Sequence, residues 1–190
     1  MKTIVYLHGF ISSPQSRKAV MLGDYVRNCV TGLGYVVPKL DDRPSRAIGQ
    51  VADACKAVDT EDLTLVGSSL GGFYATVMAE RLGCRAALLN PAVHPQRHFR
   101  KYLGPQKNLY TGEEFTLTEE HVEDLRALDP GRITRPERYW LFVETADEVL
   151  DYREAVDFYE GALHTVVQGG DHTLASFPEH VPELVEWAKS

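Results

Sequence analysis

The sequence predicts an α/β protein in one domain, residues 1–190, with about six mostly parallel strands and helices on both faces of the sheet. Short apolar runs rich in β-branched residues supply the strands. They are Thr3–Leu7, Tyr35–Val37, Leu63–Val66, Ala86–Leu89, Tyr139–Val143 and Thr165–Val167. Helical segments separate most of these runs, and such alternation is typical of parallel βαβ units, which bind ligands at the carboxyl ends of their strands.

Apolar residues three or four positions apart predict the helices. One helix follows the opening strand, a second precedes the run 63–66, and a third ends the chain. Their apolar positions are Ala19, Leu22, Val26 and Val30, then Ile48, Val51, Ala52 and Cys55, and finally Val181, Leu184, Val185 and Ala188. A further helical stretch begins near Phe73, directly after the third strand.

Residues 91–138 break the alternation and are predicted to form an insertion before the fifth strand. The segment has no convincing strand and carries five prolines. Thr118, followed by Glu119 and Glu120, predicts the capped start of an amphipathic helix, because acidic residues favour the first turn. We therefore expect a partly helical lid that covers the functional site.

Composition and charge exclude several classes of protein. The net charge of −7 argues against a nucleic-acid partner, since such a protein needs an extended basic surface. Cys29, Cys55 and Cys84 lack metal-ligand spacing and are expected to be buried, reduced thiols. The chain has no signal-peptide pattern and no apolar run near the roughly 20 residues of a membrane helix, so we expect a soluble cytoplasmic protein.

The strongest local signal is the sequence Gly67-Ser68-Ser69-Leu70-Gly71-Gly72, which follows one predicted strand and precedes a helix. Ser69 fits the pattern G-x-S-x-G. In this motif the chain turns sharply so that the serine oxygen projects above the sheet, and Gly67 and Gly71 remove side chains that would clash. The pattern is typical of the nucleophile elbow of α/β-hydrolases, although a plain glycine-rich turn would look similar.

A serine hydroxyl needs a base and an orienting acid, which in α/β-hydrolases follow the serine in the order acid, then histidine. Asp147 follows the strand 139–143, and His172 lies in a glycine-rich turn after the strand 165–167. These residues are the predicted acid and base for Ser69. The competing acids are Glu144, Asp151 and Asp171. The remaining histidines end or begin a strand or lie in the insertion or last helix: His8, His164, His94, His98, His121 and His180.

An oxyanion hole needs two backbone N–H groups directed at the developing charge. Leu70, directly after the nucleophile, supplies one at a helix N-terminus. Phe10, just after the first strand, is predicted to supply the other. Alternatively, Gly9 is only a turn residue and His8 a buried hydrogen-bonding group.

The chain resembles the YqiA-like esterases, a compact branch of the α/β-hydrolase superfamily, over nearly its whole length. The matching motifs are Tyr6-Leu7-His8-Gly9-Phe10 with Ser12, Ser13 and Pro14, the elbow, Asn90-Pro91-Ala92, Tyr110-Thr111-Gly112-Glu113-Glu114, residues 145–152 and Gly170-Asp171-His172. The resemblance implies carboxylesterase or acyl thioesterase chemistry with the same triad, no metal or organic cofactor, and a sheet without the antiparallel first strands of larger relatives. This chain has Ala146 where many relatives have a glycine before the acid. The difference affects only the assignment of Asp147 as the acid.

Residues of the insertion suggest how a substrate could be held. Six apolar residues are candidates for an acyl pocket, although at least half are expected to anchor the insertion to the core: Phe99, Tyr102, Leu103, Leu109, Tyr110 and Phe115. A basic cluster could meet a coenzyme A phosphate or be a solvated helix face: Arg97, His98, Arg100 and Lys101.

The sequence thus predicts a serine hydrolase that cleaves a small ester or thioester through an acyl-enzyme on Ser69. Two alternatives stay open. One is a catalytically silent binding protein with the hydrolase fold, and the other is a hydrolase of a different acyl substrate, such as a lactone or a peptide.

Overall fold

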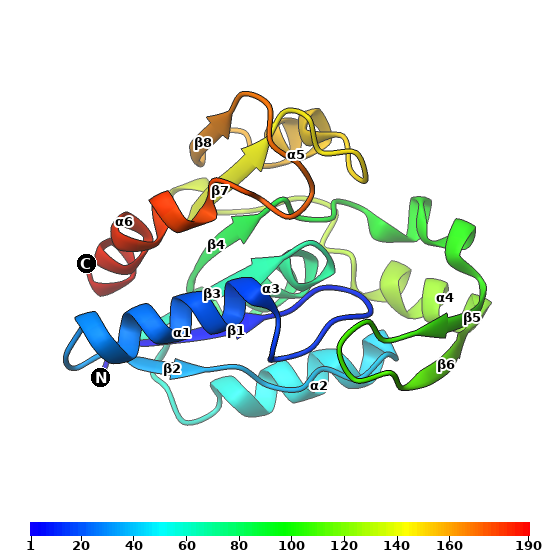
Figure 1. Cartoon of the computed structure of the whole chain (residues 1–190), viewed down its shortest axis with the longest axis horizontal. Helices are drawn as coiled ribbons and strands as arrows, with labels where there is room; N and C mark the ends of the chain where they lie inside the picture. Colours follow the sequence, from blue (N-terminus) through cyan, green and yellow to red (C-terminus); the bar gives the residue numbers. More distant parts are fainter.

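The computed structural model describes all 190 residues and contains a central six-stranded sheet in the order β2-β1-β3-β4-β7-β8 (Figure 1). Every neighbouring pair in this sheet is parallel. The strands are β1 (Thr3–Leu7), β2 (Gly34–Val36), β3 (Leu63–Ser68), β4 (Arg85–Leu89), β7 (Tyr139–Glu144) and β8 (Leu163–Val167). Each of the six predicted strands is found, and the predicted fold class is confirmed.

Helices cover both faces of the sheet (Figure 1). On one face α1 (Arg17–Cys29) and α6 (Phe177–Lys189) pack against inward residues such as Ile4 and Tyr6 of β1. On the other face α2 (Pro44–Cys55), α3 (Leu70–Leu82) and α5 (Tyr152–Phe158) pack against the alternate residues Val5 and Leu7. Because successive side chains of a strand point to opposite faces, one strand serves two cores.

The central helix α3 is buried at every position from Leu70 to Ala79, since it lies under the middle of the sheet and beside α2. It begins immediately after Ser69 and ends at Gly83, whose φ of 74° is the left-handed conformation that commonly closes a helix. The N-terminus of α3 is therefore held at the carboxyl end of β3, directly after Ser69.

The insertion, residues 91–138, contains a two-stranded antiparallel hairpin that the sequence analysis did not predict. Its strands are β5 (Gly104–Lys107) and β6 (Glu114–Leu117). The expectation of no strand in this segment is wrong, because β5 and β6 pair only with each other and carry neither the apolar run nor the β-branched content of a buried strand.

The predicted helix of the insertion is α4 (Glu119–Leu128), and Thr118 forms a capping box with His121. Polar contacts fix α4 to the start of α2, since Asp124 accepts hydrogen bonds from Arg43 Nε at 2.7 Å and from Ser45 Oγ at 2.6 Å. Three short 3-10 helices complete the insertion: η2 (Pro95–Arg97), η3 (Phe99–Tyr102) and η4 (Pro136–Arg138).

No helix of the structure has both the length and the apolar character needed to cross a membrane. All three cysteines are free thiols. Cys55 and Cys84 are buried as expected, whereas Cys29, in the last turn of α1, is exposed, contrary to the expectation that all three would be buried.

Candidate active site

Ser69 lies at the sharp turn between β3 and α3. Its backbone has φ 54° and ψ −120°, a conformation that is strained for a residue with a side chain. A Cβ atom at Gly67 would overlap the Gly71 carbonyl, and one at Gly71 would overlap the Leu7 carbonyl. The turn is held from both sides, because Ser69 N donates to the Leu89 carbonyl at 3.0 Å and the Ser69 carbonyl accepts from a backbone N–H at residue 92, also at 3.0 Å.

Ser69, His172 and Asp147 form one hydrogen-bonded chain. His172 Nε2 lies 3.1 Å from Ser69 Oγ, and His172 Nδ1 lies 2.8 Å from Asp147 Oδ2. The three residues come from the loops after β3, β8 and β7, so the parallel order of the strands brings them together at one edge of the sheet. The imidazole is partly open, with 21% of its side chain exposed, whereas the Asp147 side chain is 2% exposed.

Asp147 is held as an anion that points at the imidazole. Its Oδ1 atom accepts the backbone N–H groups of Val149 at 2.8 Å and Leu150 at 2.9 Å. Burial acts to raise the pKa of Asp147, but the hydrogen bonds from His172, Leu150 and Val149 outweigh it, so the pKa is lowered. An ionised Asp147 fixes the His172 tautomer with a proton on Nδ1, which leaves Nε2 free to accept the hydroxyl proton of Ser69.

The competing acids have other contacts. Asp151 caps α5 by accepting the Arg153 N–H at 3.0 Å. Asp171 accepts hydrogen bonds from the backbone and hydroxyl of Thr173 at 2.8 and 2.5 Å. Glu144 is 1% exposed and faces backbone groups. None of the three touches the imidazole, whereas Asp147 does.

Glu144 positions the loop that carries His172, a role the sequence analysis did not assign to it. Its carboxylate accepts the backbone N–H groups of Asp171 at 2.6 Å, Ala175 at 3.1 Å and Ser176 at 2.7 Å. Burial acts to raise the pKa of Glu144, yet the Ser176 side chain and these backbone hydrogen bonds lower it overall. Its place at the carboxyl end of a strand was the only sequence signal for this residue.

Asn90 is the second positioning residue that the sequence left unassigned, although it belongs to a motif of the resemblance. It is buried and has a positive φ of 41°. Its Nδ2 atom donates to the Asp171 carbonyl at 3.0 Å and the His172 carbonyl at 3.3 Å, and its Oδ1 accepts the Glu144 N–H at 3.0 Å. The end of β4 is thereby tied to both β7 and the histidine loop.

Both predicted oxyanion donors have a free backbone N–H group. Leu70 is the first residue of α3, and Phe10 lies in the turn after β1; neither backbone N–H has an acceptor within the protein. This turn runs against the nucleophile, since a Cβ atom on Gly9 would be 3.3 Å from Ser69 Cβ and 3.9 Å from Ser69 Oγ. An oxyanion hole requires two free N–H groups of this kind beside the nucleophile.

His8 has a structural role beside this turn. Its Nε2 accepts the Leu40 N–H at 3.1 Å, and Nδ1 lies 3.1 Å from the Gly9 carbonyl. Burial lowers the pKa of His8, which favours the neutral imidazole that can donate through Nδ1 and accept through Nε2. The interpretation of His8 as a buried hydrogen-bonding group fits these contacts.

A pocket of about 320 Å³ opens at Ser69 and His172. Its wall is formed by the loop 9–12, the first turns of α1, the segment 172–178 and the hairpin tip. The hairpin tip, residues 108–113, reaches the loop because Leu109 N donates to the Ile11 carbonyl at 3.0 Å and Asn108 Nδ2 donates to the Ser12 carbonyl at 2.8 Å.

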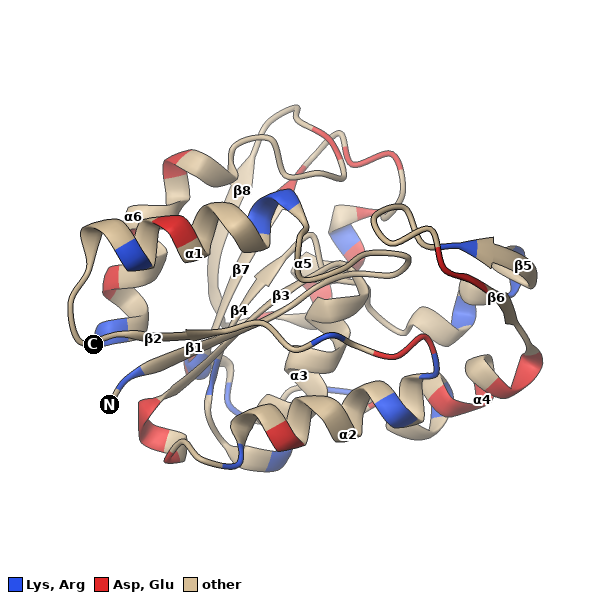
Figure 2. Cartoon of the chain, turned by 60° about the horizontal axis from the view of Figure 1, so that its bottom comes forward, with Lys and Arg blue, Asp and Glu red and all other residues tan.

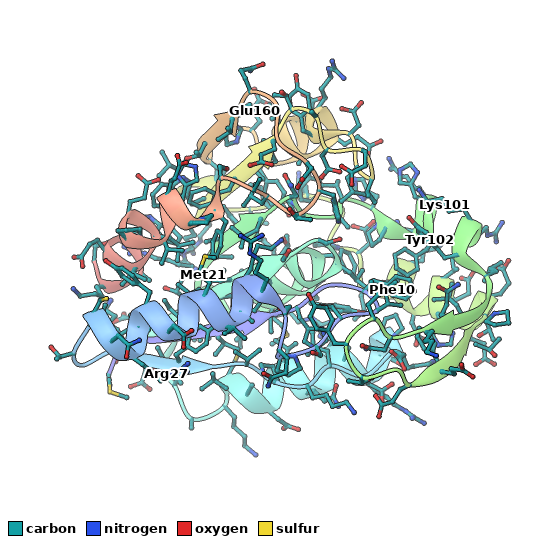
Figure 3. All side chains as sticks on the ribbon, in the orientation of Figure 1. Phe10, Met21, Arg27, Lys101, Tyr102 and Glu160 are labelled. Atoms are coloured by element: carbon teal, nitrogen blue, oxygen red, sulfur yellow. The ribbon has the colours of Figure 1, made fainter.

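Of the six apolar candidates in the insertion, Leu109 and Tyr110 line this pocket. Phe99, Tyr102 and Phe115 instead surround the Phe10 ring, with centroid distances of 4.9, 5.8 and 6.0 Å. Figure 3 shows Phe10 and Tyr102 on the same side of the molecule. They anchor the insertion to the turn after β1, and Leu103 does not line the pocket either.

The basic cluster of the insertion also lies away from the pocket. Arg100 pairs with Glu119 at 3.2 Å, His98 lies 3.5 Å from Glu154, and the Lys101 ammonium lies 4.9 Å from the centre of the Tyr102 ring. Figure 3 shows Lys101 at the outer edge of the molecule. These contacts fit the interpretation of a solvated face, and no residue of the cluster lines the pocket at Ser69. No group of three or more His, Cys, Asp or Glu side chains is arranged to hold a metal ion.

Comparison with solved structures shows the fold. Alpha/beta hydrolase domain-containing protein 10 from mouse has a TM-score of 0.73 and 14% identity, and the match covers 97% of this chain and 90% of that one. A monoacylglycerol lipase of Paleococcus ferrophilus has a TM-score of 0.68 and 13% identity, covering 98% and 93%. The chain therefore has the α/β-hydrolase fold.

Comparison at the level of sequence shows the family. A UPF0227 protein of Vibrio cholerae serotype O1 is 27% identical over 161 residues, which cover 80% of this chain and 86% of that protein. The model of the "Uncharacterised protein family (UPF0227)" matches residues 3–189. These matches confirm the resemblance to YqiA-like proteins drawn from the motifs. The chain belongs to the UPF0227 family.

Proposed function

We propose that this protein is a serine hydrolase that cleaves carboxylic esters or acyl thioesters of small molecules through an acyl-enzyme on Ser69. The observation that carries the proposal is the hydrogen-bonded chain from Ser69 Oγ through His172 to Asp147, at 3.1 and 2.8 Å, on a strained strand-to-helix turn. Strain of this kind persists where the surrounding structure requires it and is concentrated at functional sites.

The mechanism proceeds in two steps. His172 Nε2 takes the Ser69 proton as Oγ attacks the substrate carbonyl, and the Phe10 and Leu70 N–H groups bind the oxyanion. His172 then gives the proton to the leaving alcohol or thiol. In the second step His172 activates a water that releases the acid from Ser69. Asp147 stays ionised throughout and stabilises the imidazolium.

In this proposal the chain is a single domain, and the insertion 91–138 covers part of the pocket at Ser69. Its hairpin tip places Leu109 and Tyr110 at the pocket mouth, where they are 76% and 50% exposed. Neighbouring apolar side chains that are exposed at the rim of a pocket are suited to contact an apolar ligand. They would cover the apolar part of a bound ester.

The first test is hydrolysis of 4-nitrophenyl esters of increasing chain length and of acyl-CoA thioesters by wild type and Ser69→Ala. We expect the mutant to lose most of the turnover, by about 10⁶-fold if the triad acts as a unit. Labelling by a fluorophosphonate should occur on wild type and be absent from Ser69→Ala. The neighbouring Ser68→Ala variant is the matched control and should still be labelled.

The two measurements also separate the alternatives. A folded wild type that is labelled but cleaves no ester would point to another acyl substrate, such as a lactone or a peptide. A folded wild type that is neither labelled nor active would reject the hydrolase and favour the binding protein. Turnover retained by Ser69→Ala would reject Ser69 as the nucleophile.

A further inference from the structure

The charged residues that line the pocket at Ser69 are opposite in sign to the net charge of the chain. The protein has 27 acidic and 20 basic residues, yet no Asp or Glu lines this pocket, whereas Arg17 and Lys18 do. Figure 2 shows these basic positions at the N-terminal end of α1. Cationic groups that line a cleft attract an anion, because low-dielectric walls concentrate the field.

Lys18 has donors to spare. Its Nζ donates to the Thr173 carbonyl at 2.7 Å, and this is its one hydrogen bond within the protein. An ammonium has three N–H donors, so two of them have no protein acceptor. Burial lowers the pKa of Lys18 to about 8, against the opposing charges of Asp171, Glu144 and Asp147, so the side chain is mostly protonated at neutral pH.

The position of the two cations is unfavourable for stability. Arg17 and Lys18 are the first residues of α1, and its first turn contains no acidic residue. Cations at a helix N-terminus are repelled by the helix dipole, and these two also repel each other. Neither forms an ion pair with a carboxylate. Local rules are broken in this way mainly at functional sites.

Apolar side chains also line the pocket. Met21, Leu174 and Phe177 line it, and the latter two are fully buried members of the core between α1 and α6. The pocket thus presents apolar side chains next to two cationic groups, and Ser69 and His172 line it as well. A ligand that satisfies both has an apolar stem and an anionic head.

We infer that the substrate is an ester or thioester whose pocket-bound portion carries an anionic oxygen group, a carboxylate or a phosphate, and that Arg17 and Lys18 bind this group. The inference rests on the proposed hydrolase function and names its substrate class. The carboxylate would belong to the acyl part, as in a half-ester of a dicarboxylic acid, and the phosphate to the leaving group, as in an acyl-CoA.

The test uses two matched pairs of substrates. The first compares 4-nitrophenyl hydrogen glutarate with neutral 4-nitrophenyl valerate, and the second compares butyryl-CoA with S-butyryl-pantetheine, which lacks the phosphates. In one of the pairs, wild type should favour the anionic member by about tenfold or more in kcat/KM. The pair that shows the preference identifies which part of the substrate carries the charge.

The next step removes both cations in one double variant and, separately, replaces Lys18 by another cation. Arg17→Gln with Lys18→Met should bring the anionic-to-neutral ratio close to one, mainly through KM, whereas Lys18→Arg should retain most of the preference. The ratio within each variant corrects for any loss of folded enzyme. Arg100→Gln, a cation outside the pocket, is the control and should keep the wild-type ratio.

Failure of the inference differs from failure of the proposed function. A wild type that cleaves both members of each pair equally well, or a double variant that keeps the preference, overturns the role of Arg17 and Lys18 while leaving the hydrolase intact. A folded wild type that cleaves no member of either pair overturns the esterase and thioesterase proposal, and the substrate class with it.

Discussion

Gly170 lies so close to the Glu144 carboxylate that a Cβ atom on residue 170 would overlap Oε2. The same carboxylate accepts three backbone N–H groups of the segment 171–176, so the loop that carries His172 is wrapped around one buried anion. The distance between His172 and Ser69 therefore depends on Glu144, which forms a hydrogen bond with neither side chain. Catalytic geometry of this kind needs support to within a fraction of an ångström.

Glu144→Gln should impair both stability and turnover. The glutamine amide would place an N–H₂ group against backbone donors, leaving some of them without an acceptor at a cost of about 1–3 kcal/mol. We expect a lower Tm in thermal unfolding and a lower kcat toward a neutral ester, with KM little changed. Glu179→Gln, an exposed residue on α6, is the control. A wild-type kcat in Glu144→Gln would contradict the positioning role.

Gly170→Ala and Gly169→Ala form a matched pair. Both glycines have positive φ, 73° and 82°, so alanine is strained at either position. A Cβ at Gly169 meets no atom within 4 Å, whereas one at Gly170 meets the Glu144 carboxylate. Gly170→Ala should therefore lose more activity and more stability than Gly169→Ala, as measured by kcat and by urea unfolding. Equal losses would mean that backbone strain alone matters there.

Asp147→Asn should reduce kcat by about 10³- to 10⁴-fold with a small effect on Tm. The backbone N–H groups of Val149 and Leu150 require an oxygen, so the asparagine would turn its N–H₂ toward His172 Nδ1. That donor forces the proton onto Nε2, which can then no longer accept the Ser69 proton. Asp151→Asn, in the cap of α5, is the control and should keep most of the turnover. Similar rates for both variants would reject Asp147 as the acid.

The parts of this structure that sequence could predict are those with a local cause. The elbow at Ser69 needs glycine at positions 67 and 71, because any side chain there would collide with backbone a few residues away or with β1. The loops of Asp147 and His172 follow strands whose apolar runs are visible in the sequence. Since parallel strands end at the same edge of the sheet, the order of the runs was enough to predict that the loops of Asp147 and His172 lie near Ser69.

The parts that sequence could not predict depend on distant contacts. The strand β5 includes Pro105 and pairs only with β6, so no apolar pattern reveals it. The function of Glu144 is set by the loop that follows β8, some 27 residues further on, folding back over its carboxylate. The acidic sequence at 144–151 offers four carboxylates, and only the folded loop decides which one meets His172.

Leu109→Ala and Tyr110→Ala test whether the hairpin tip covers the substrate. Both side chains are largely exposed, so their truncation should leave Tm unchanged. If they contact a bound ester, KM for long-chain neutral esters should rise by about fivefold, equivalent to ~1 kcal/mol of lost apolar contact, with little effect on short-chain esters. Leu163→Ala on β8, which is 50% exposed and outside the pocket, is the control. A chain-length profile unchanged from wild type would remove the hairpin from the binding site.

The lowered pKa of Glu144 predicts a dependence of stability on pH. A carboxyl group whose pKa is lower in the folded state stabilises the fold fully at pH values above its unfolded pKa, which is close to 4.5. This stabilisation is lost as the pH falls from there through the folded pKa, because the folded protein must then bind a proton that breaks the contacts with the histidine loop.

Urea unfolding should therefore show that the free-energy difference between wild type and Glu144→Gln is constant near neutral pH and shrinks below about pH 4.5. Glu179→Gln should run parallel to wild type over the same range. A difference between wild type and Glu144→Gln that stays constant into the acid range would contradict the lowered pKa of Glu144 in the folded protein.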